Sequence, residues 1–181
     1  VVADRFEIEA LIAEGGMARV YRCIDHHFGV RVALKVFRLD KPDARQRFAL
    51  EAEVLARLSH PGLVKALDYG HARIGSNELR PFLALELLRG ESLGAQLARR
   101  RQLPWREAVD LGIQVAATLH FLHEAGVVHR DLKPHNLVVL AGATPRVKVV
   151  DLGLCKLTDR FTRSLERAPL PRLTCIDLGQ P

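Results

Sequence analysis

HRDLKPHN, residues 129–136, places an acid, a base and an amide in one polar loop, after a helix-like segment and before an apolar one. A second motif, the tripeptide DLG beginning at Asp151, follows another apolar segment. The carboxylate of Asp131 can accept a hydroxyl proton, and Lys133 can neutralise a phosphoryl group in transfer. Asn136 and Asp151 offer the hard oxygen ligands that magnesium prefers. Because a chance loop rarely combines these residue types, the motifs predict a site for phosphoryl transfer.

Upstream of this loop, a predicted helix carries a charge among its apolar positions. The helix runs from about Asp43 to Leu58, and its apolar stripe consists of Phe48, Ala52 and Leu55. Glu51 falls inside that stripe, where an ionised carboxylate is costly unless a cation meets it. Lys35 is the best available cation, so we expect an ion pair that positions Lys35 for an anionic ligand. The alternative leaves Glu51 in water at the edge of the stripe and Lys35 reaching toward solvent.

Three segments before this helix are typical of β-strands, because apolar and polar residues partly alternate in them. They are Phe6–Ala13, Arg19–Ile24 and Val30–Phe37. The turn Glu14-Gly15-Gly16-Met17-Ala18 links the first two segments. Glycines let backbone N–H groups approach phosphate oxygens without a Cβ in the way. On its own, however, a Gly-Gly turn is more typical of a simple hairpin.

The rest of the pattern predicts two strands, a long helix and two further strands. The strands Leu63–Tyr69 and Phe82–Leu88 flank a polar loop, and a helix follows over Glu107–His123. The last two strands are Leu137–Leu140 and Val147–Val150. A β-rich lobe with one helix therefore precedes a mostly helical lobe, which is an α+β fold. The tripeptide Gly90-Glu91-Ser92 marks the expected crossing between the lobes.

The composition is typical of a globular, cytoplasmic domain. Of the 181 residues, 48% are hydrophobic and 27% are charged, which is a normal balance for a folded chain. No apolar run reaches the roughly 18 residues that a membrane span needs, and the first residues lack the pattern of a signal peptide. The cysteines are too few and too scattered for a disulfide framework or a zinc site, so we expect reduced thiols at Cys23, Cys155 and Cys175.

The net charge of +6 does not by itself predict a nucleic-acid partner. Lysines and arginines are spread along the chain, and the one basic run, Arg99-Arg100-Arg101, has no aromatic partners. A solvated helix end is the simpler interpretation of that run. We therefore expect no nucleic acid among the partners.

Taken together, the motifs resemble the protein-kinase signature set in their order and spacing. Val32-Ala33-Leu34-Lys35 resembles the strand lysine motif of that family, and Glu51 resembles its helix glutamate. Asp131 resembles the catalytic-loop aspartate, and the DLG tripeptide at Asp151 resembles a variant of the magnesium motif. The resemblance covers about residues 4–157 and implies a two-lobe kinase fold.

Two further features narrow the resemblance. Lys133, two places after the aspartate, is similar to serine/threonine kinases rather than tyrosine kinases. The stretches EGGMARVY (residues 14–21) and HPGLV (residues 60–64) resemble the bacterial, Hanks-type members. The resemblance therefore implies ATP-dependent phosphorylation of serine and threonine hydroxyls on protein substrates, with ATP and Mg²⁺ as cofactors. It leaves open whether the parent protein associates with a membrane.

The resemblance also implies roles for individual residues. Asp131 and Lys133 are the expected catalytic residues, and Asn136 and Asp151 are the expected metal ligands. The residues expected to bind the nucleotide are Ala13, Glu14, Gly15, Gly16, Val20, Ala33, Lys35, Glu51, Leu85, Glu86, Leu88 and Leu137. We expect an ATP-binding N-lobe over residues 1–88, a partial C-lobe with the catalytic loop over 89–157, and an irregular tail over 158–181.

The sequence departs from the family at two places. The three glycines of the family's loop correspond to Ala13, Gly15 and Ala18, so only the middle one is present. After Leu157 no Ala-Pro-Glu-like anchor follows, which suggests a fragment with a truncated C-lobe and an exposed apolar patch. The alternatives are a pseudokinase or ATP-binding scaffold that transfers nothing, and a small-molecule phosphotransferase of kinase-like fold.

Overall fold

The computed structural model describes residues 2, 5–38, 43–74 and 78–167, and these form two compact units. Of the described residues, the first unit contains those up to Glu53 together with Ala66–Leu87, and the second contains Val54–Lys65 and those from Leu88 to Arg167. Most of the expected tail, including Cys175, lies outside the described residues.

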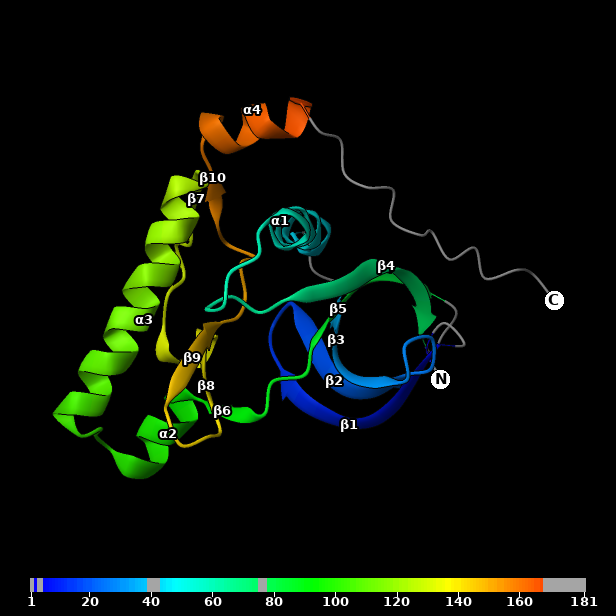
Figure 1. The fold of residues 1–181 in the computed structure, drawn as a ribbon. Helices are drawn as coiled ribbons and strands as arrows, with labels where there is room; N and C mark the ends of the chain where they lie inside the picture. Colours follow the sequence, from blue (N-terminus) through cyan, green and yellow to red (C-terminus); the bar gives the residue numbers. More distant parts are fainter. Residues whose placement is uncertain (1, 3–4, 39–42, 75–77, 168–181) are drawn as a thin grey trace. The chain divides into compact units, whose positions relative to one another are not determined.

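The first unit is built on a five-stranded antiparallel sheet with the order β1-β2-β3-β5-β4 (Figure 1). Its strands are β1 (Phe6–Glu14), β2 (Ala18–Asp25), β3 (Val30–Phe37), β4 (Ala66–Ile74) and β5 (Glu78–Glu86). Alternating apolar residues build the core on one side of the sheet, where Val32 and Leu34 of β3 are fully buried. All five strands predicted for this part of the chain therefore exist, and β3 has the predicted bounds.

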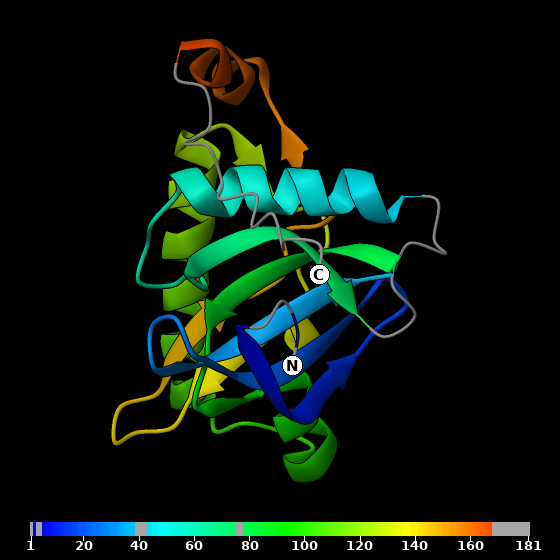
Figure 2. The same ribbon diagram turned by 90° about the vertical axis from the view of Figure 1, so that its right-hand side faces the viewer.

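Helix α1 (Ala44–Arg57) runs across the β4–β5 side of this sheet (Figure 2). Phe48 fixes it there, because its ring meets Phe37 of β3 at 5.4 Å and Tyr69 of β4 at 6.5 Å, both edge to face. Such aromatic pairs stabilise a core beyond the area that they bury. The predicted helix is confirmed to within one residue at each end.

A buried ion cluster ties the start of the chain to the same sheet. Arg5 donates hydrogen bonds to both carboxylate oxygens of Asp25 on β2, at 2.8 and 2.7 Å, and a third to Asp68 on β4. Asp25 is fully buried, and the Arg5 guanidinium also lies 4.7 Å from the centre of the Phe6 ring. Because a buried carboxylate is tolerated only when it is paired, Arg5 holds this corner of the sheet together.

The second unit contains two small sheets and three α-helices among its described residues. Strands β6 (Gly90–Ser92), β8 (Leu137–Leu140) and β9 (Arg146–Val149) form one sheet, and β7 (Val127–Val128) pairs with β10 (Lys156–Leu157) in the other. The helices are α2 (Leu93–Arg100), α3 (Trp105–Glu124) and α4 (Asp159–Arg167), with a 3₁₀ turn, η1, at Pro134–Asn136.

The largest differences from the predicted elements concern β4, β5, α2 and α4, and the short strands β6, β7 and β10 were not predicted either. Strand β4 starts three and ends five residues after its predicted range, and β5 starts four and ends two residues before its own. The cause is a hairpin that pairs residues such as His71 and Pro81, which were expected in a loop. Helix α2 was not predicted, although Ser92 caps its N-terminus by accepting from the Ala95 N–H at 3.1 Å. Residues 159–167, expected to be irregular, form α4, whose Phe161 is buried.

The sequence also led to expectations about the cysteines and about membrane-spanning segments. Cys23 and Cys155 form no disulfide within the described residues, and both are buried, which agrees with the expectation of reduced thiols. Burial raises the pKa of the Cys23 thiol to about 11. Among the described residues, no helix has the length and apolarity required to cross a bilayer.

Candidate active site

The first part of the candidate site is a buried ion pair in the first unit. The Lys35 Nζ on β3 donates to both carboxylate oxygens of Glu51 on α1, at 2.9 and 2.6 Å. Glu51 is 1% exposed, and the Lys35 side chain is 12% exposed. The predicted pair is therefore confirmed, and the alternative with Glu51 in water is wrong. Breaking such a pair costs about 3–5 kcal/mol, because one charge stays buried without its partner.

Cross-strand pairing places other predicted nucleotide-binding residues beside this lysine. In the sheet register, Ala13 of β1 lies opposite Val20 of β2, and Val20 lies opposite Lys35 of β3. Ala33 lies two residues before Lys35, opposite Leu85 of β5. Because directly opposed residues share a face of the sheet, all five point to the same side. This face can present small and apolar side chains next to one ammonium group.

The turn after β1 is closed by one backbone hydrogen bond and does not require glycine for its conformation. The Gly15 N–H donates to the Ala18 carbonyl at 2.9 Å, and both Gly15 and Gly16 are exposed. Glu14 places its carboxylate in an exposed ion pair with Arg19 at 2.8 Å. Glu14 therefore contributes its backbone rather than a free carboxylate to this turn. The remaining predicted residue of the first unit, Glu86, ends β5 and is half-buried.

The second part of the candidate site is the loop before η1, in the second unit. Asp131 accepts hydrogen bonds at Oδ2 from Lys133 Nζ at 2.7 Å and from Asn136 Nδ2 at 3.1 Å. Its Oδ1 accepts no hydrogen bond from the described residues. The hydrogen bond from Lys133 lowers the pKa of Asp131 below its ordinary value of 3.8. Asp131 is thus an ionised carboxylate with one oxygen fixed and the other available.

The same loop fixes the orientation of Asn136. Its Nδ2 donates to the Asp131 carbonyl at 2.9 Å as well as to the carboxylate, so the amide oxygen Oδ1 is the group left for a ligand. The Val150 N–H donates to the Asn136 carbonyl at 2.9 Å, which links the loop to the segment before Asp151. Asp151 is half-buried, and its Oδ1 accepts from the Gly153 N–H at 3.2 Å. Amide and carboxylate oxygens suit Mg²⁺, so these residues fit that ion.

Backbone strain marks the same two segments. Arg130 and Asp151 adopt positive φ angles of 65° and 89° although neither is glycine. Such conformations cost on the order of 1–3 kcal/mol each and are concentrated at functional sites. The sequence cannot reveal this strain, because nothing in the residue types at these positions requires it.

His129 supports the catalytic loop from the core of the second unit. It is 3% exposed, and its Nδ1 accepts from the Asp131 N–H at 3.2 Å. Burial lowers the pKa of His129, with the charge of Asp151 acting in the opposite direction, so the ring is neutral at pH 7. Its Nε2 has no hydrogen-bond partner within the described residues. Leu137 follows the loop as the first residue of β8 and is buried, and Leu88 is half-buried.

Strand β9, which leads to Asp151, is held along its free edge. Gln114 of α3 donates to the Pro145 carbonyl at 3.0 Å and accepts from the Val147 N–H at 3.1 Å. On the same strand, the Val149 N–H donates to the Gly62 carbonyl at 2.7 Å, and the Val64 N–H donates back to the Val149 carbonyl at 3.0 Å. Gln114 was not predicted as a supporting residue, because Asp110 and Thr118, its neighbours on the same side of the helix, are also polar, so the residue pattern does not single it out.

Comparison with known proteins agrees with this geometry. The sequence profile of the family described as "Protein kinase domain" matches residues 6–168. The serine/threonine-protein kinase PknA of Mycobacterium tuberculosis is 37% identical over 161 residues, which cover 87% of this chain and 37% of PknA. The DNA damage-responsive serine/threonine-protein kinase RqkA of Deinococcus radiodurans is 39% identical over 171 residues, covering 93% of this chain and 25% of RqkA.

The fold has a counterpart among solved structures. The crystal structure of Rad53 1-466 in complex with AMP-PNP matches with a TM-score of 0.73 and 24% sequence identity, covering 82% of this chain and 39% of that one. At this identity the match supports the fold alone. The chain spans well under half of the length of each of these proteins. With the family profile matching nearly all of its length, the chain belongs to the protein kinase family.

Proposed function

We propose that this chain is the ATP-binding and catalytic-loop segment of a serine/threonine protein kinase. The observation that carries the proposal is the geometry of Asp131, whose Oδ2 is held by Lys133 and Asn136 while Oδ1 is left for a substrate hydroxyl. The bacterial relatives named above are serine/threonine kinases, which favours serine and threonine hydroxyls of proteins as acceptors.

The proposed reaction moves the γ-phosphoryl group of ATP to a hydroxyl oxygen. A new bond forms between that oxygen and the γ-phosphorus, the bond to the β–γ bridging oxygen breaks, and ADP leaves. Asp131 Oδ1 orients the hydroxyl and takes its proton, while Lys133 neutralises charge on the transferring group. Lys35, held by Glu51, binds the α- and β-phosphates. Bound Mg²⁺ would supply charge neutralisation at the phosphates, and Asn136 and Asp151 would hold it.

The nucleotide-binding set is a prediction that stays with the proposal. Ala13, Val20, Ala33, Leu85 and Leu137 provide apolar surface for the adenine, while the turn at Gly15 and Gly16 brings backbone without a Cβ close to the phosphates. Glu86 and Leu88 meet the edge of the adenine through their backbone. The expected lobe boundaries at residues 88 and 157, and cytoplasmic location, also stay predictions.

Incubation with Mg-ATP labelled at the γ-phosphate and a generic basic protein tests the proposal. We expect label on serine and threonine, lost when EDTA removes Mg²⁺. Asp151→Ala and Lys35→Ala lower transfer by roughly a hundredfold or more. Lys35→Ala removes the cation that binds the phosphates, and Asp151→Ala removes a carboxylate that would hold Mg²⁺. Lys156→Ala, which removes an exposed lysine of β10, leaves transfer unchanged. An Asp151→Ala variant with normal transfer would refute the proposal.

A pseudokinase is the competing hypothesis, because Ala13 and Ala18 replace the outer glycines of the loop between β1 and β2. The same preparation distinguishes the two. If calorimetry detects Mg-ATP binding by that preparation while no label reaches protein, the segment is an ATP-binding module rather than a kinase.

A further inference from the structure

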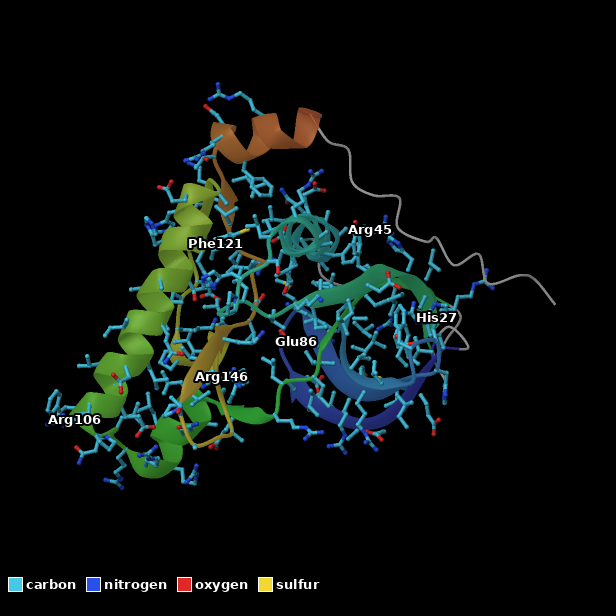
Figure 3. All side chains as sticks on the ribbon, viewed as in Figure 1. His27, Arg45, Glu86, Arg106, Phe121 and Arg146 are labelled. Carbon is cyan, nitrogen blue, oxygen red and sulfur yellow. The ribbon has the colours of Figure 1, made fainter. Side chains whose placement is uncertain are left out.

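The turn between α2 and α3 gathers arginines around an exposed aromatic ring. Trp105 begins α3 and is 68% exposed. The Arg106 guanidinium lies 4.6 Å from the centre of its ring, at the end of α3 nearest α2 (Figure 3). Three more arginines end α2 or follow it directly. We call this surface the α2–α3 corner, and its members are Arg99, Arg100, Arg101, Trp105 and Arg106.

Two of the four arginines already have acidic partners. Arg99 pairs with Glu91 at 2.8 Å, and Arg100 pairs with Glu107 at 2.9 Å. Arg101 and Arg106 are exposed and form no ion pair with the part of the chain that the structure describes. The corner therefore presents two arginines without an ion pair among the described residues, one of them, Arg106, over the exposed indole ring.

The backbone at Arg101 is a second observation at this corner. Arg101 ends α2 with φ 63° and ψ −35°, and its N–H donates to the Leu97 carbonyl at 2.8 Å. Glycine is the usual residue at a left-handed helix end, because it has no Cβ to strain the turn. Helix termination thus gives no reason for an arginine here, and strain of this kind is typical of positions with another role.

We propose that the α2–α3 corner is a docking site for an acidic segment of a partner protein, with Trp105 as its apolar anchor. Tryptophan and arginine are the residue types that dominate binding energy at protein interfaces. The planar guanidinium groups of Arg101 and Arg106 match carboxylates in two-point hydrogen bonding. The inference does not depend on phosphoryl transfer by the segment.

The corner fits a protein segment better than a lipid surface or a nucleic acid. Single-stranded nucleic acid needs successive aromatic platforms, and an anionic bilayer is repelled by acidic side chains next to the basic ones. Trp105 is the only aromatic residue of the corner, and the exposed Asp110 lies one turn after Arg106. The other side of α2 is occupied, since a Cβ on Gly94 would come within 2.8 Å of the His135 ring. An acidic segment can end before Asp110, whereas an anionic bilayer extends over it.

Trp105 provides the readout, because it is the only tryptophan in the 181 residues. The full chain is titrated with a tryptophan-free synthetic peptide of Asp, Glu and Leu while indole emission is recorded. We expect a saturable blue shift that weakens as salt is added, because charge attraction is screened. A peptide with Lys in place of Asp and Glu serves as the control and leaves the emission unchanged.

Charge reversal tests whether the corner itself binds. The double variant Arg101→Glu with Arg106→Glu raises the Kd for the acidic peptide by about tenfold or more. Arg45→Glu with Arg73→Glu makes the same change of net charge at exposed positions of the first unit and leaves the Kd within about twofold. Equal losses in the two double variants, or an emission spectrum that the peptide does not change, overturn the proposal. So does a blue shift with phosphatidylserine vesicles but not with the acidic peptide, because the corner then binds lipid.

Discussion

At the scale of the residue, a substitution of Gly15 tests whether the turn after β1 binds phosphate, because the fold does not need a glycine there. Its φ is not positive, and a Cβ would meet only the Ala18 carbonyl at 3.8 Å. We expect Gly15→Ala to change the Tm by less than about 2 °C. The added methyl group blocks the closest approach of a phosphate to the backbone of this turn, so the Kd for Mg-ATP rises by about tenfold. Calorimetry and thermal unfolding measure the two effects.

Gly29 supplies the opposite control. It adopts φ +66° in the turn between β2 and β3, so Gly29→Ala strains the backbone and lowers the Tm. Its affinity for Mg-ATP per folded molecule is expected to stay unchanged. A Gly15→Ala variant that binds Mg-ATP as well as the original chain would show that the phosphates do not approach this turn.

Asp25 gives a second prediction at this scale. Burial raises the pKa of Asp25, but the Arg5 and backbone hydrogen bonds outweigh it and lower the pKa below 3.8 overall. At pH values between the lowered pKa and 3.8, Asp25 therefore binds a proton more often in the unfolded chain than in the folded one. The stabilisation is therefore complete above that range and is lost as pH falls through it. Urea unfolding from about pH 2 to about pH 7 measures this loss in the free energy of unfolding.

Replacing Asp25 removes this pH-dependent part. We expect Asp25→Asn to lower the free energy of unfolding at pH 7 by about 3–5 kcal/mol, because Arg5 loses its fully buried partner. Glu91→Gln, which removes the partner of Arg99 in an exposed ion pair, changes stability little. If both variants unfold at the same urea concentration as the original chain, the buried cluster contributes nothing.

The chemistry of single residues was largely predictable, whereas their backbone geometry was not. The pairing of Lys35 with Glu51 follows from the sequence because a charge inside an apolar stripe must find a partner. The orientation of Asn136, with its amide nitrogen turned to Asp131, depends on the path of the loop between them. The positive φ at Arg130 and Asp151 likewise arises from tertiary packing, which residue types alone do not encode.

At the scale of the element, β9 is the strand whose position matters most, because it leads directly to Asp151. Gln114 completes its free edge by bonding both a carbonyl and an N–H of the strand segment. We expect Gln114→Leu to lower the free energy of unfolding by about 1–3 kcal/mol, since two partly buried backbone groups lose their partner. It also lowers phosphoryl transfer, because Asp151 is positioned less well. Urea unfolding and the labelled-ATP assay measure the two effects.

The control for this prediction lies on the same unit. Gln102 is exposed in the turn between α2 and α3, so Gln102→Leu removes a glutamine without removing a hydrogen bond to β9. Its stability and transfer are expected to stay unchanged. Gln114→Leu with the stability of the original chain would mean that water replaces the glutamine at no cost.

The predictability of the elements depended on the length of their pattern. The strand Val30–Phe37 and the helix near Ala44–Arg57 have regular periodicity and were placed within a residue. Helix α2 was missed because eight residues give barely two turns of periodicity, and its Ser92 cap was taken for a crossing between lobes. Helix α4 was missed because, among residues 159–163, whose burial the structure describes, Phe161 alone is apolar and buried, so no periodic pattern marks the helix.

At the scale of the whole molecule, the described chain exposes apolar side chains along one face of α3. Trp105, Val109 and Ile113 recur every four residues and are 68%, 50% and 63% exposed. Residues at this spacing share one face of a helix. Leu111, Thr118 and Leu122 are buried on the opposite side. The sequence predicted an exposed apolar surface on this helix, and the prediction is confirmed for the residues that the structure describes.

This face is expected to limit the solubility of the chain despite its net charge of +6, because contiguous exposed apolar surface promotes association. Val109→Lys with Ile113→Lys should raise the concentration at which light scattering begins and leave the Tm within about 2 °C. Leu122→Lys places the same charge on the buried side of the same helix and should unfold the second unit, because a lysine there has no partner. If the double variant loses as much stability as Leu122→Lys, the face is packed in solution against chain outside the described residues, and the expected gain in solubility will not occur.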